Sequence, residues 1–139
     1  MRWTNRREKQ MRWLKLLVVL LVLCLPACQE KSGGPAHTLK EALEALEKED
    51  YDAYLRCVDF GTEMDSMQVA CMRQVLRQHV GWRRSKCPSV VSIDMIDSQM
   101  QGDSICTVYY QYTFADSTKD VGAQKMVRLG ETWKIRLRN

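Results

Sequence analysis

The apolar residues of this chain change their spacing once, between its first half and its second. In the first half they recur every three or four positions, which places them on one face of a helix. In the second half they alternate with other residues, which places them on one face of a strand. Helices followed by an antiparallel meander predict an α+β fold, with three N-terminal helices packed on a four-stranded antiparallel sheet.

The first two expected helices have start signals, and the third has an expected end signal. Thr38-Leu39-Lys40-Glu41 reads as a capping box, so the first helix should begin at Thr38. Asp50 can cap the second helix. The third should run from about Asp65 or Ser66 to Val80, with Gly81 as a left-handed C-cap. The expected inward residues are Leu39, Ala42, Leu43 and Leu46, then Tyr51, Tyr54, Leu55 and Val58, then Val69, Met72, Val75, Leu76 and Val80.

Two hairpins account for the four expected strands. The first joins residues 89–99 to residues 105–114 through a turn at Gln101-Gly102-Asp103, and the second joins residues 121–129 to residues 132–137. If Gly130-Glu131-Thr132 is a three-residue loop, Val127 and Leu129 lie on the same side as Trp133 and Ile135. The expected inward residues are Val91, Ile93 and Met95, then Cys106, Val108, Tyr110, Tyr112 and Phe114, then Trp133, Ile135 and Leu137.

The N-terminal residues have the order of a secretory signal. A basic start precedes an apolar run of ten residues, 16–25, which is well short of the ~20 that a membrane-spanning helix needs. In the following Leu25-Pro26-Ala27-Cys28, Leu25 and Ala27 fit a lipobox and Pro26 is unusual for one. The segment resembles a bacterial lipoprotein signal, which implies cleavage between Ala27 and Cys28 and attachment of fatty chains such as palmitate to the Cys28 thiol.

Three segments are therefore expected. Residues 1–27 form the signal peptide, residues 28–37 a flexible tether with a Gly-Gly-Pro break, and residues 38–139 one α+β domain. Met11 is an alternative start. Without the signal, the 21 Lys and Arg fall to 15 and the 17 Asp and Glu fall to 16, a net charge of −1. A near-neutral domain gives no reason to expect a nucleic-acid partner.

Four cysteines remain after the signal and Cys28 are set aside: Cys57, Cys71, Cys87 and Cys106. An even number in an exported protein permits two disulfides with three possible pairings. A Cys57–Cys71 bridge ranks first, because both residues fall on helices that are adjacent in sequence. Free buried thiols are the open alternative. With no Cys-x-x-Cys pair and only two histidines, neither a metal site nor a cofactor is expected.

The order of three helices and four strands, with ALEALEKEDYDAYLRCV near its start and MVRLGETWKIRL near its end, resembles the nuclear transport factor 2-like superfamily. In particular, it is similar to small domains of unknown function in many Gram-negative lipoproteins. The resemblance covers residues 38–137 and implies a strongly curved, cone-like sheet whose open end holds a small molecule or forms a dimer. Six residues are candidates to line that cavity: Met72, His79, Tyr110, Tyr112, Phe114 and Trp133. The alternative is that they are ordinary core.

Some members of that superfamily are isomerases or dehydratases with a carboxylate or His-Asp base and a tyrosine donor. His79, Asp94 and Tyr110 are the one set here that could imitate them. Asp94, however, alternates with Ile93 and Met95 and should point outward, so no catalytic residue is assigned. Residues 82–86, Trp-Arg-Arg-Ser-Lys, are a basic cluster that could bind phosphate, glycan or anionic lipid, or be a solvated connection.

The leading hypothesis is a non-catalytic binding module, lipid-anchored in the bacterial cell envelope at the outer membrane on its periplasmic or surface face. Its expected partners are the membrane, through lipidated Cys28, and a small hydrophobic ligand or an envelope protein. A homodimer is also considered. The alternatives are an isomerase-like or hydrolase-like cone enzyme and an envelope protein-interaction or dimerisation domain.

Overall fold

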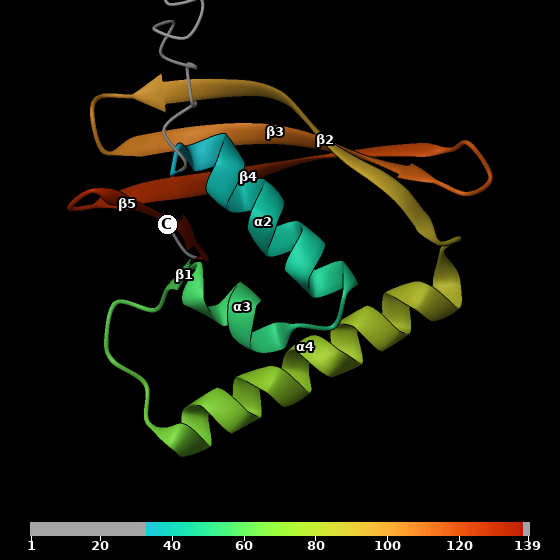
Figure 1. Ribbon diagram of the computed structural model, residues 1–139, viewed down its shortest axis with the longest axis horizontal. Coiled ribbons are helices and arrows are strands. Elements are labelled where there is room, and N and C mark those ends of the chain that lie inside the picture. The colour runs from blue at the N-terminus through green and yellow to red at the C-terminus, as the bar shows by residue number, and fades with distance from the viewer. Residues whose placement is uncertain (1–32, 138–139) are drawn as a thin grey trace, which may run out of the picture. The chain divides into compact units, whose positions relative to one another are not determined.

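A sheet and a set of three helices make up residues 33–137, the part of the chain that this computed structural model describes. The elements follow in the order α2 (Pro35–Glu47), α3 (Tyr51–Arg56), β1 (Val58–Asp59), α4 (Ser66–Lys86), β2 (Val90–Gln101), β3 (Ile105–Phe114), β4 (Lys119–Leu129) and β5 (Thr132–Arg136) (Figure 1). The predicted signal peptide, its cleavage site at Ala27 and Cys28, and residues 28–32 of the tether lie outside the described residues. Within residues 33–137, no helix is long and apolar enough to cross a membrane.

The strands form one curved sheet in the order β1-β5-β4-β3-β2, and only the β1–β5 pair is parallel. The predicted α+β class is confirmed, but the expected four strands are five. Val58 belongs to β1 and not to the second helix, because α3 ends at Arg56. The Ile135 N–H then donates to the Cys57 carbonyl at 2.6 Å, which joins the chain to the edge of the sheet.

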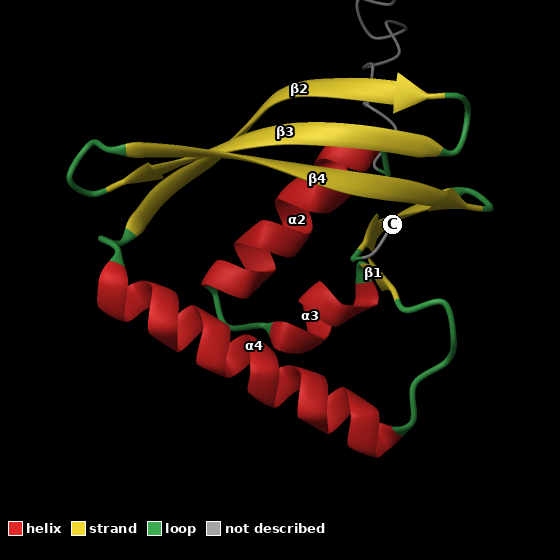
Figure 2. Cartoon of the chain, turned by 180° about the vertical axis from the view of Figure 1, so that it is seen from behind, coloured by secondary structure: helices red, strands yellow, loops and turns green. Residues whose placement is uncertain are grey.

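The main core lies between α2 and the inner face of the sheet (Figure 2). Helix α2 contributes Leu39, Ala42 and Leu43, all buried as the helical spacing predicted. The sheet contributes buried residues from every strand: Val58, Ile93, Cys106, Val108, Met126 and Ile135. The helix therefore rests with its apolar stripe across the sheet.

A second, smaller core joins α4 to the other helices. It contains Leu46 at the end of α2, Tyr51 and Leu55 of α3, and Leu76 and Val80 of α4. Val75 was predicted to widen the inner stripe of α4, and this is wrong: its side chain is 49% exposed. The face that α4 buries is narrow because α4 packs on two short helical segments and not on the sheet.

Two predicted helix ends are corrected by the structure. Helix α2 begins at Pro35, with Gly34 as its N-cap, so Thr38 is inside the helix and its N–H donates to Gly34 O at 3.0 Å. Proline suits the first helical position because its fixed φ matches the helix and its missing N–H would be unpaired there. Helix α4 continues through Gly81 to Lys86, so Gly81 is not a C-cap.

The other helix starts were predicted correctly. Asp50 caps α3, accepting from the Ala53 N–H at 3.1 Å. Asp65 caps α4 in a reciprocal capping box: its carboxylate accepts from Gln68 N at 2.8 Å, and the Gln68 side chain accepts from Asp65 N at 3.0 Å.

Alternation predicts the inward side of β3 correctly but fails at the start of β2. The pairing of β2 with β3 shifts register between Val90 and Ser92, so Val91 is an extra residue that points outward. A bulge of this kind reverses which side of the sheet the residues before it face. Val90 therefore lies on the core side, where Val91 was expected. Ile93 lies inside as predicted, and Met95 packs against the same cluster.

The turn between β4 and β5 has two residues, Gly130 and Glu131, and not three, because Leu129 pairs directly with Thr132. Gly130 has a φ of +63°, a backbone conformation that glycine adopts without strain. A turn that is shorter by one residue puts the other set of β4 side chains on the same side of the sheet as Trp133 and Ile135. Met126 takes the place of Val127 in the main core beside Ile135, whereas Val127 is buried outside that core and Leu129 is exposed. Trp133 lies on the core side, whereas Leu137 follows the strand and is exposed.

The four cysteines within residues 33–137 are all free, so the predicted Cys57–Cys71 disulfide is absent. The Cys57 thiol instead donates to the carbonyl of Ala53 at 3.4 Å. Cys71 is exposed on α4, away from the buried side that meets α3.

Gly122 is tested by replacement with alanine. A Cβ there would lie 2.4 Å from Cζ of Tyr110, its partner across β3 and β4. We expect Gly122→Ala to lower the free energy of unfolding by about 1–3 kcal/mol through overpacking. Gly81→Ala is the matched control, since nothing lies within 4 Å of its added Cβ. It should raise the stability by about 0.5–1 kcal/mol. Urea denaturation measures both, and an unchanged Gly122→Ala midpoint would contradict the packing.

Candidate functional site

Three aromatic side chains form a row on the inner face of β3, toward its C-terminal end. The rings of Tyr110 and Tyr112 meet edge to face with centroids 5.5 Å apart, and those of Tyr112 and Phe114 stack at 6.2 Å. Phe114 is buried, whereas the two tyrosines are half-buried beside the main core. Three of the six residues predicted to line a cavity therefore lie together, in contact with one another.

Arg83 of α4 closes over this row. Its guanidinium lies 5.6 Å from the centroid of the Tyr112 ring and forms an ion pair with Glu47 at the end of α2. The Arg83 and Glu47 side chains are only 16% and 19% exposed. Partial removal from water strengthens both the ion pair and the cation–π contact. The three residues therefore connect α2, α4 and the sheet at one point.

A hollow of about 420 Å³ lies beside this contact. Val90 forms part of its wall and is the strand partner of Phe114, and Ser89 O accepts from Ala115 N at 2.8 Å. The hollow therefore adjoins the end of the aromatic row. Its lining residues are Glu47, Arg83, Arg84, Cys87, Pro88, Ser89 and Val90.

Arg84 is the more accessible of the two guanidiniums in this hollow. It donates to the backbone carbonyl of Glu47 at 2.5 Å and pairs with Glu49 at 3.1 Å, with its side chain 46% exposed. The Arg83 and Arg84 guanidiniums, each paired with a glutamate, lie on one side of the hollow, and Pro88 and Val90 lie in its wall as well, so the lining is both charged and apolar. Such a surface can bind a small molecule that carries both an anionic and an apolar part.

The tyrosines of this region hold their protons. Burial raises the pKa of Tyr112 to about 12, with a further increase from Tyr110 and an opposing effect of Arg83. Burial also raises the pKa values of Tyr110 and Tyr54. At neutral pH these hydroxyls are therefore neutral hydrogen-bonding groups and not bases.

The remaining predicted lining residues lie elsewhere. Met72 is half-buried in the small core between the helices, and His79 is exposed on α4. Trp133 packs against the main core from β5, opposite Arg128. None of the six predicted lining residues, Tyr110, Tyr112 and Phe114 included, is among those that line the hollow beside Arg83.

The three residues considered as an enzyme-like set, His79, Asp94 and Tyr110, do not lie together. Asp94 is exposed and accepts a hydrogen bond from the Ser92 hydroxyl at 3.3 Å. It pairs with Gln111, so it projects from the opposite face of the sheet to Tyr110. The prediction that Asp94 points outward is confirmed. Among the described residues, no group of three His, Cys, Asp or Glu side chains is placed to hold a metal ion.

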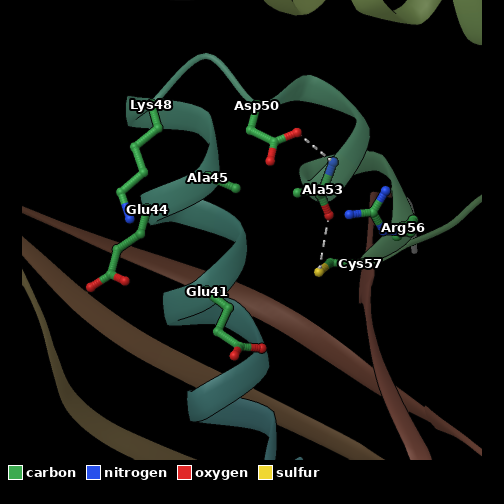
Figure 3. Close-up of a pocket in the computed structure, with 8 residues that line it drawn as sticks. All are labelled: Glu41, Glu44, Ala45, Lys48, Asp50, Ala53, Arg56 and Cys57. Atoms are coloured by element: carbon green, nitrogen blue, oxygen red, sulfur yellow. Dashed lines mark hydrogen bonds between the residues drawn. The ribbon is translucent and has the colours of Figure 1, made fainter.

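A second hollow, of about 450 Å³, separates α2 from α3 (Figure 3). Its lining mixes acidic and basic side chains with one thiol: Glu41, Glu44, Ala45, Lys48, Asp50, Ala53, Arg56 and Cys57. Asp50 is engaged as the cap of α3, and burial raises the pKa of Cys57, against a lowering effect of Lys134. Figure 3 shows the Glu44 carboxylate directed away from Cys57, so these groups do not converge on one point.

Sequence reasoning missed Arg83 and Glu47. Residues 82–86 were noticed as a basic cluster, but the helix was expected to end at Gly81, which would have left Arg83 in a loop. Because α4 continues to Lys86, Arg83 is held on the helix side that faces Glu47. The one signal available was the absence of a breaker other than Gly81 before Pro88.

Known proteins resemble this chain in fold. No protein-family model and no curated protein matches the sequence. A candidate NTF2-like transpeptidase from Campylobacter jejuni superposes with a TM-score of 0.62 at 11% identity, covering 76% of this chain and 100% of that chain. A SEC-C motif containing protein from Rhodopseudomonas palustris gives a TM-score of 0.49 at 11% identity, covering 77% of this chain and 80% of that chain. The domain therefore has a nuclear transport factor 2-like fold, as the resemblance in sequence implied.

The raised pKa of Tyr112 predicts a loss of stability in alkali. In the unfolded chain this hydroxyl ionises near its ordinary pKa of 10.0, whereas the folded state holds the proton up to about 12. The folded state binds more protons in that window, so the free energy of unfolding should fall as the pH rises from 10 to 12. Tyr112→Phe should make the fall shallower, leaving the part due to Tyr54 and Tyr110. Urea denaturation at several pH values measures the slope, and equal slopes would contradict this assignment.

Proposed function

We propose that the protein is a lipid-anchored, non-catalytic binding module of the bacterial cell envelope, with its ligand site in the hollow beside Arg83. The observation that carries the site is the Arg83–Glu47–Tyr112 contact at the edge of that hollow. This contact joins α2, α4 and β3 and holds the charged side chains in position before any ligand binds. A preorganised site loses less entropy on binding than one that must form around its ligand.

The lining favours a small ligand with a carboxylate or phosphate at one end and an apolar body. The Arg84 guanidinium is half-exposed and paired with an exposed glutamate, Glu49, which an anionic ligand group would replace, because arginine matches carboxylate and phosphate oxygens in pairs. Pro88 and Val90 would contact the apolar part. Glu47 is taken up by Arg83, which limits its repulsion of such an anion.

The anchor is supported by the sequence. An apolar run at residues 16–25 precedes Leu25-Pro26-Ala27-Cys28, the order expected of a lipoprotein signal. Helix α2 begins at Pro35, so six residues, 29–34, would link lipidated Cys28 to the folded domain. A link of this length would keep the domain close to the bilayer. An outer-membrane location belongs to the same proposal.

An isomerase-like or hydrolase-like enzyme is the weaker proposal. It would need a base and a donor on the same side of the sheet, whereas Asp94 and Tyr110 project from opposite faces and His79 is exposed. A protein-interaction role is compatible with the binding module.

Metabolic labelling with radioactive palmitate tests the anchor. We expect label in the wild-type chain and in Cys24→Ser, and none in Cys28→Ser, because only the residue after the cleavage site receives lipid. Cys24 lies four residues before Cys28 and is the matched control. Label retained in Cys28→Ser would overturn the anchor.

Titration calorimetry with small aromatic carboxylates, each compared with its neutral amide, tests the hollow. We expect the acids to bind and the amides not to, because the guanidinium needs an anion. Arg84→Gln should weaken binding about tenfold or more, since a hydrogen bond to a charged group contributes about 1.5–3 kcal/mol. Arg56→Gln, in the other hollow, should have no effect. Equal binding of acids and amides, or of neither, would contradict the proposed site.

A further inference from the structure

Glu49 has a backbone conformation that glutamate rarely adopts. Its φ is +60°, and Ser117 is the other non-glycine residue with a positive φ within residues 33–137. The left-handed conformation brings the side chain of an L-residue too close to its own backbone, whereas glycine adopts it without this cost. Residues held in this way persist only where contacts around them compensate, and they cluster at functional sites.

The turn that ends α2 requires this conformation but not a glutamate. The Glu49 N–H donates to Leu46 O at 3.1 Å. The next N–H, that of Asp50, donates to Ala45 O at 2.9 Å. This pair of bonds is a Schellman motif, whose left-handed position is usually filled by glycine. A glycine would close the same turn without strain, so the glutamate is explained by what its side chain contacts.

The side chain of Glu49 contacts Arg84, the residue of the hollow that is proposed to bind an anion. The end of α2 lies beside α4 in both views of the domain (Figures 1 and 2). Nη1 of Arg84 pairs with the Glu49 carboxylate at 3.1 Å, and Nη2 donates to the Glu47 carbonyl at 2.5 Å. The second contact is to the backbone and does not depend on Glu49. The guanidinium therefore keeps its position when the carboxylate leaves it.

We propose that Glu49 is a built-in competitor for the anion that the hollow binds. In the empty domain its carboxylate occupies Nη1 of Arg84, a donor that would otherwise hold the carboxylate or phosphate of a ligand. A ligand binds by displacing this carboxylate, so Glu49 lowers the affinity for every anion. The effect on ligand selection rests on the proposed ligand site, whereas the contact of Glu49 with Arg84 does not.

The two glutamates near the hollow differ in how firmly they are held. Glu47 and Arg83 are mostly removed from water, so their pair is costly to separate. The Arg84 and Glu49 side chains are 46% and 55% exposed, and an exposed pair shifts an equilibrium by no more than about fivefold. Glu49 is thus the glutamate that a ligand can displace.

Displacement favours one class of anion. A ligand with an apolar part gains contacts with Pro88 and Val90, which the Glu49 carboxylate does not make. A simple inorganic anion gains no such contact and only exchanges one anion for another on Arg84. The competitor therefore selects anions that carry an apolar body.

Titration calorimetry with the aromatic acids described above tests the competitor. Glu49→Gln keeps the left-handed backbone but removes the charge, and it should bind the acids about two- to fivefold more tightly than the wild type. Glu49→Gly removes the charge and the strain together and should give the same increase. Glu44→Gln is the matched control, because its exposed carboxylate pairs with Lys40 and does not line this hollow. Its affinity should equal that of the wild type.

Two results would overturn the proposal. One is an increase in affinity for Glu49→Gly alone, which would assign the effect to the backbone and not to the carboxylate. The other is unchanged acid binding in both Glu49 variants, together with a lower urea midpoint, which would give the ion pair a role in stability only. We expect the midpoint of Glu49→Gly to be at or above that of the wild type, since glycine releases the strain.

Arginine modification by phenylglyoxal tests the same contact without any ligand. The reagent must reach the guanidine nitrogens, which a paired carboxylate hinders. The rate at Arg84, resolved by peptide mass spectrometry and divided by the rate at Arg77, should rise about two- to fivefold in Glu49→Gln and stay unchanged in Glu44→Gln. Arg77 is the internal reference because it is exposed and makes no ion pair within residues 33–137. Equal ratios in Glu49→Gln and the wild type would overturn the proposal.

The titration also separates this proposal from the ligand site on which it rests. Acids that bind the wild type and Glu49→Gln with equal affinity would overturn the competitor and leave the ligand site standing. Acids that bind neither the wild type nor any variant would overturn both, because a competitor needs a ligand to displace it.

Discussion

The burial of α2 between the sheet and the other two helices is the interaction on which the rest of the domain depends. Its stripe meets the sheet through Leu39, Ala42 and Leu43 and meets α4 through Leu46. Each fully buried leucine contributes about 1.5–3 kcal/mol. Because α4 packs on helices and not on the sheet, α2 and the short α3 hold it at its position. They also place Glu47, the last residue of α2, against Arg83.

The Glu47–Arg83 pair shows how a charged contact becomes part of a binding surface. Both side chains are mostly removed from water, so neither could remain in place without its partner. The contact of Arg83 with Tyr112 extends the pair to the sheet, which α4 otherwise does not reach through a core of its own. The hollow beside it is thus bordered by Glu47 of α2, by Arg83 of α4 and by Val90 of β2.

The candidate site divides into a part that local sequence predicts and a part that it does not. Alternation placed Tyr110, Tyr112 and Phe114 on one inward face of β3, because side chains on a strand project to the same side at every second position. Arg83 and Glu47 are 36 residues apart, and their meeting depends on α4 continuing past Gly81. Glycine disfavours a helix interior by only about 1 kcal/mol, which the packing of Val80 next to it can offset.

By itself, the sequence determined the α+β class, the buried stripes of α2 and α3, the cap at Asp50, the start of α4 near Asp65, and the inner face of β3. All of these follow from residue spacing and from hydrogen bonds between near neighbours. Tertiary structure alone decided the rest. Pairing across the sheet created β1, the bulge at Val91 and the two-residue turn at Gly130, since each depends on which backbone groups a neighbouring strand offers. The contact of Arg83 with Glu47 and Tyr112 also depends on tertiary structure. It requires α4 to continue past Gly81, and a helix ends where contacts with other elements no longer stabilise it.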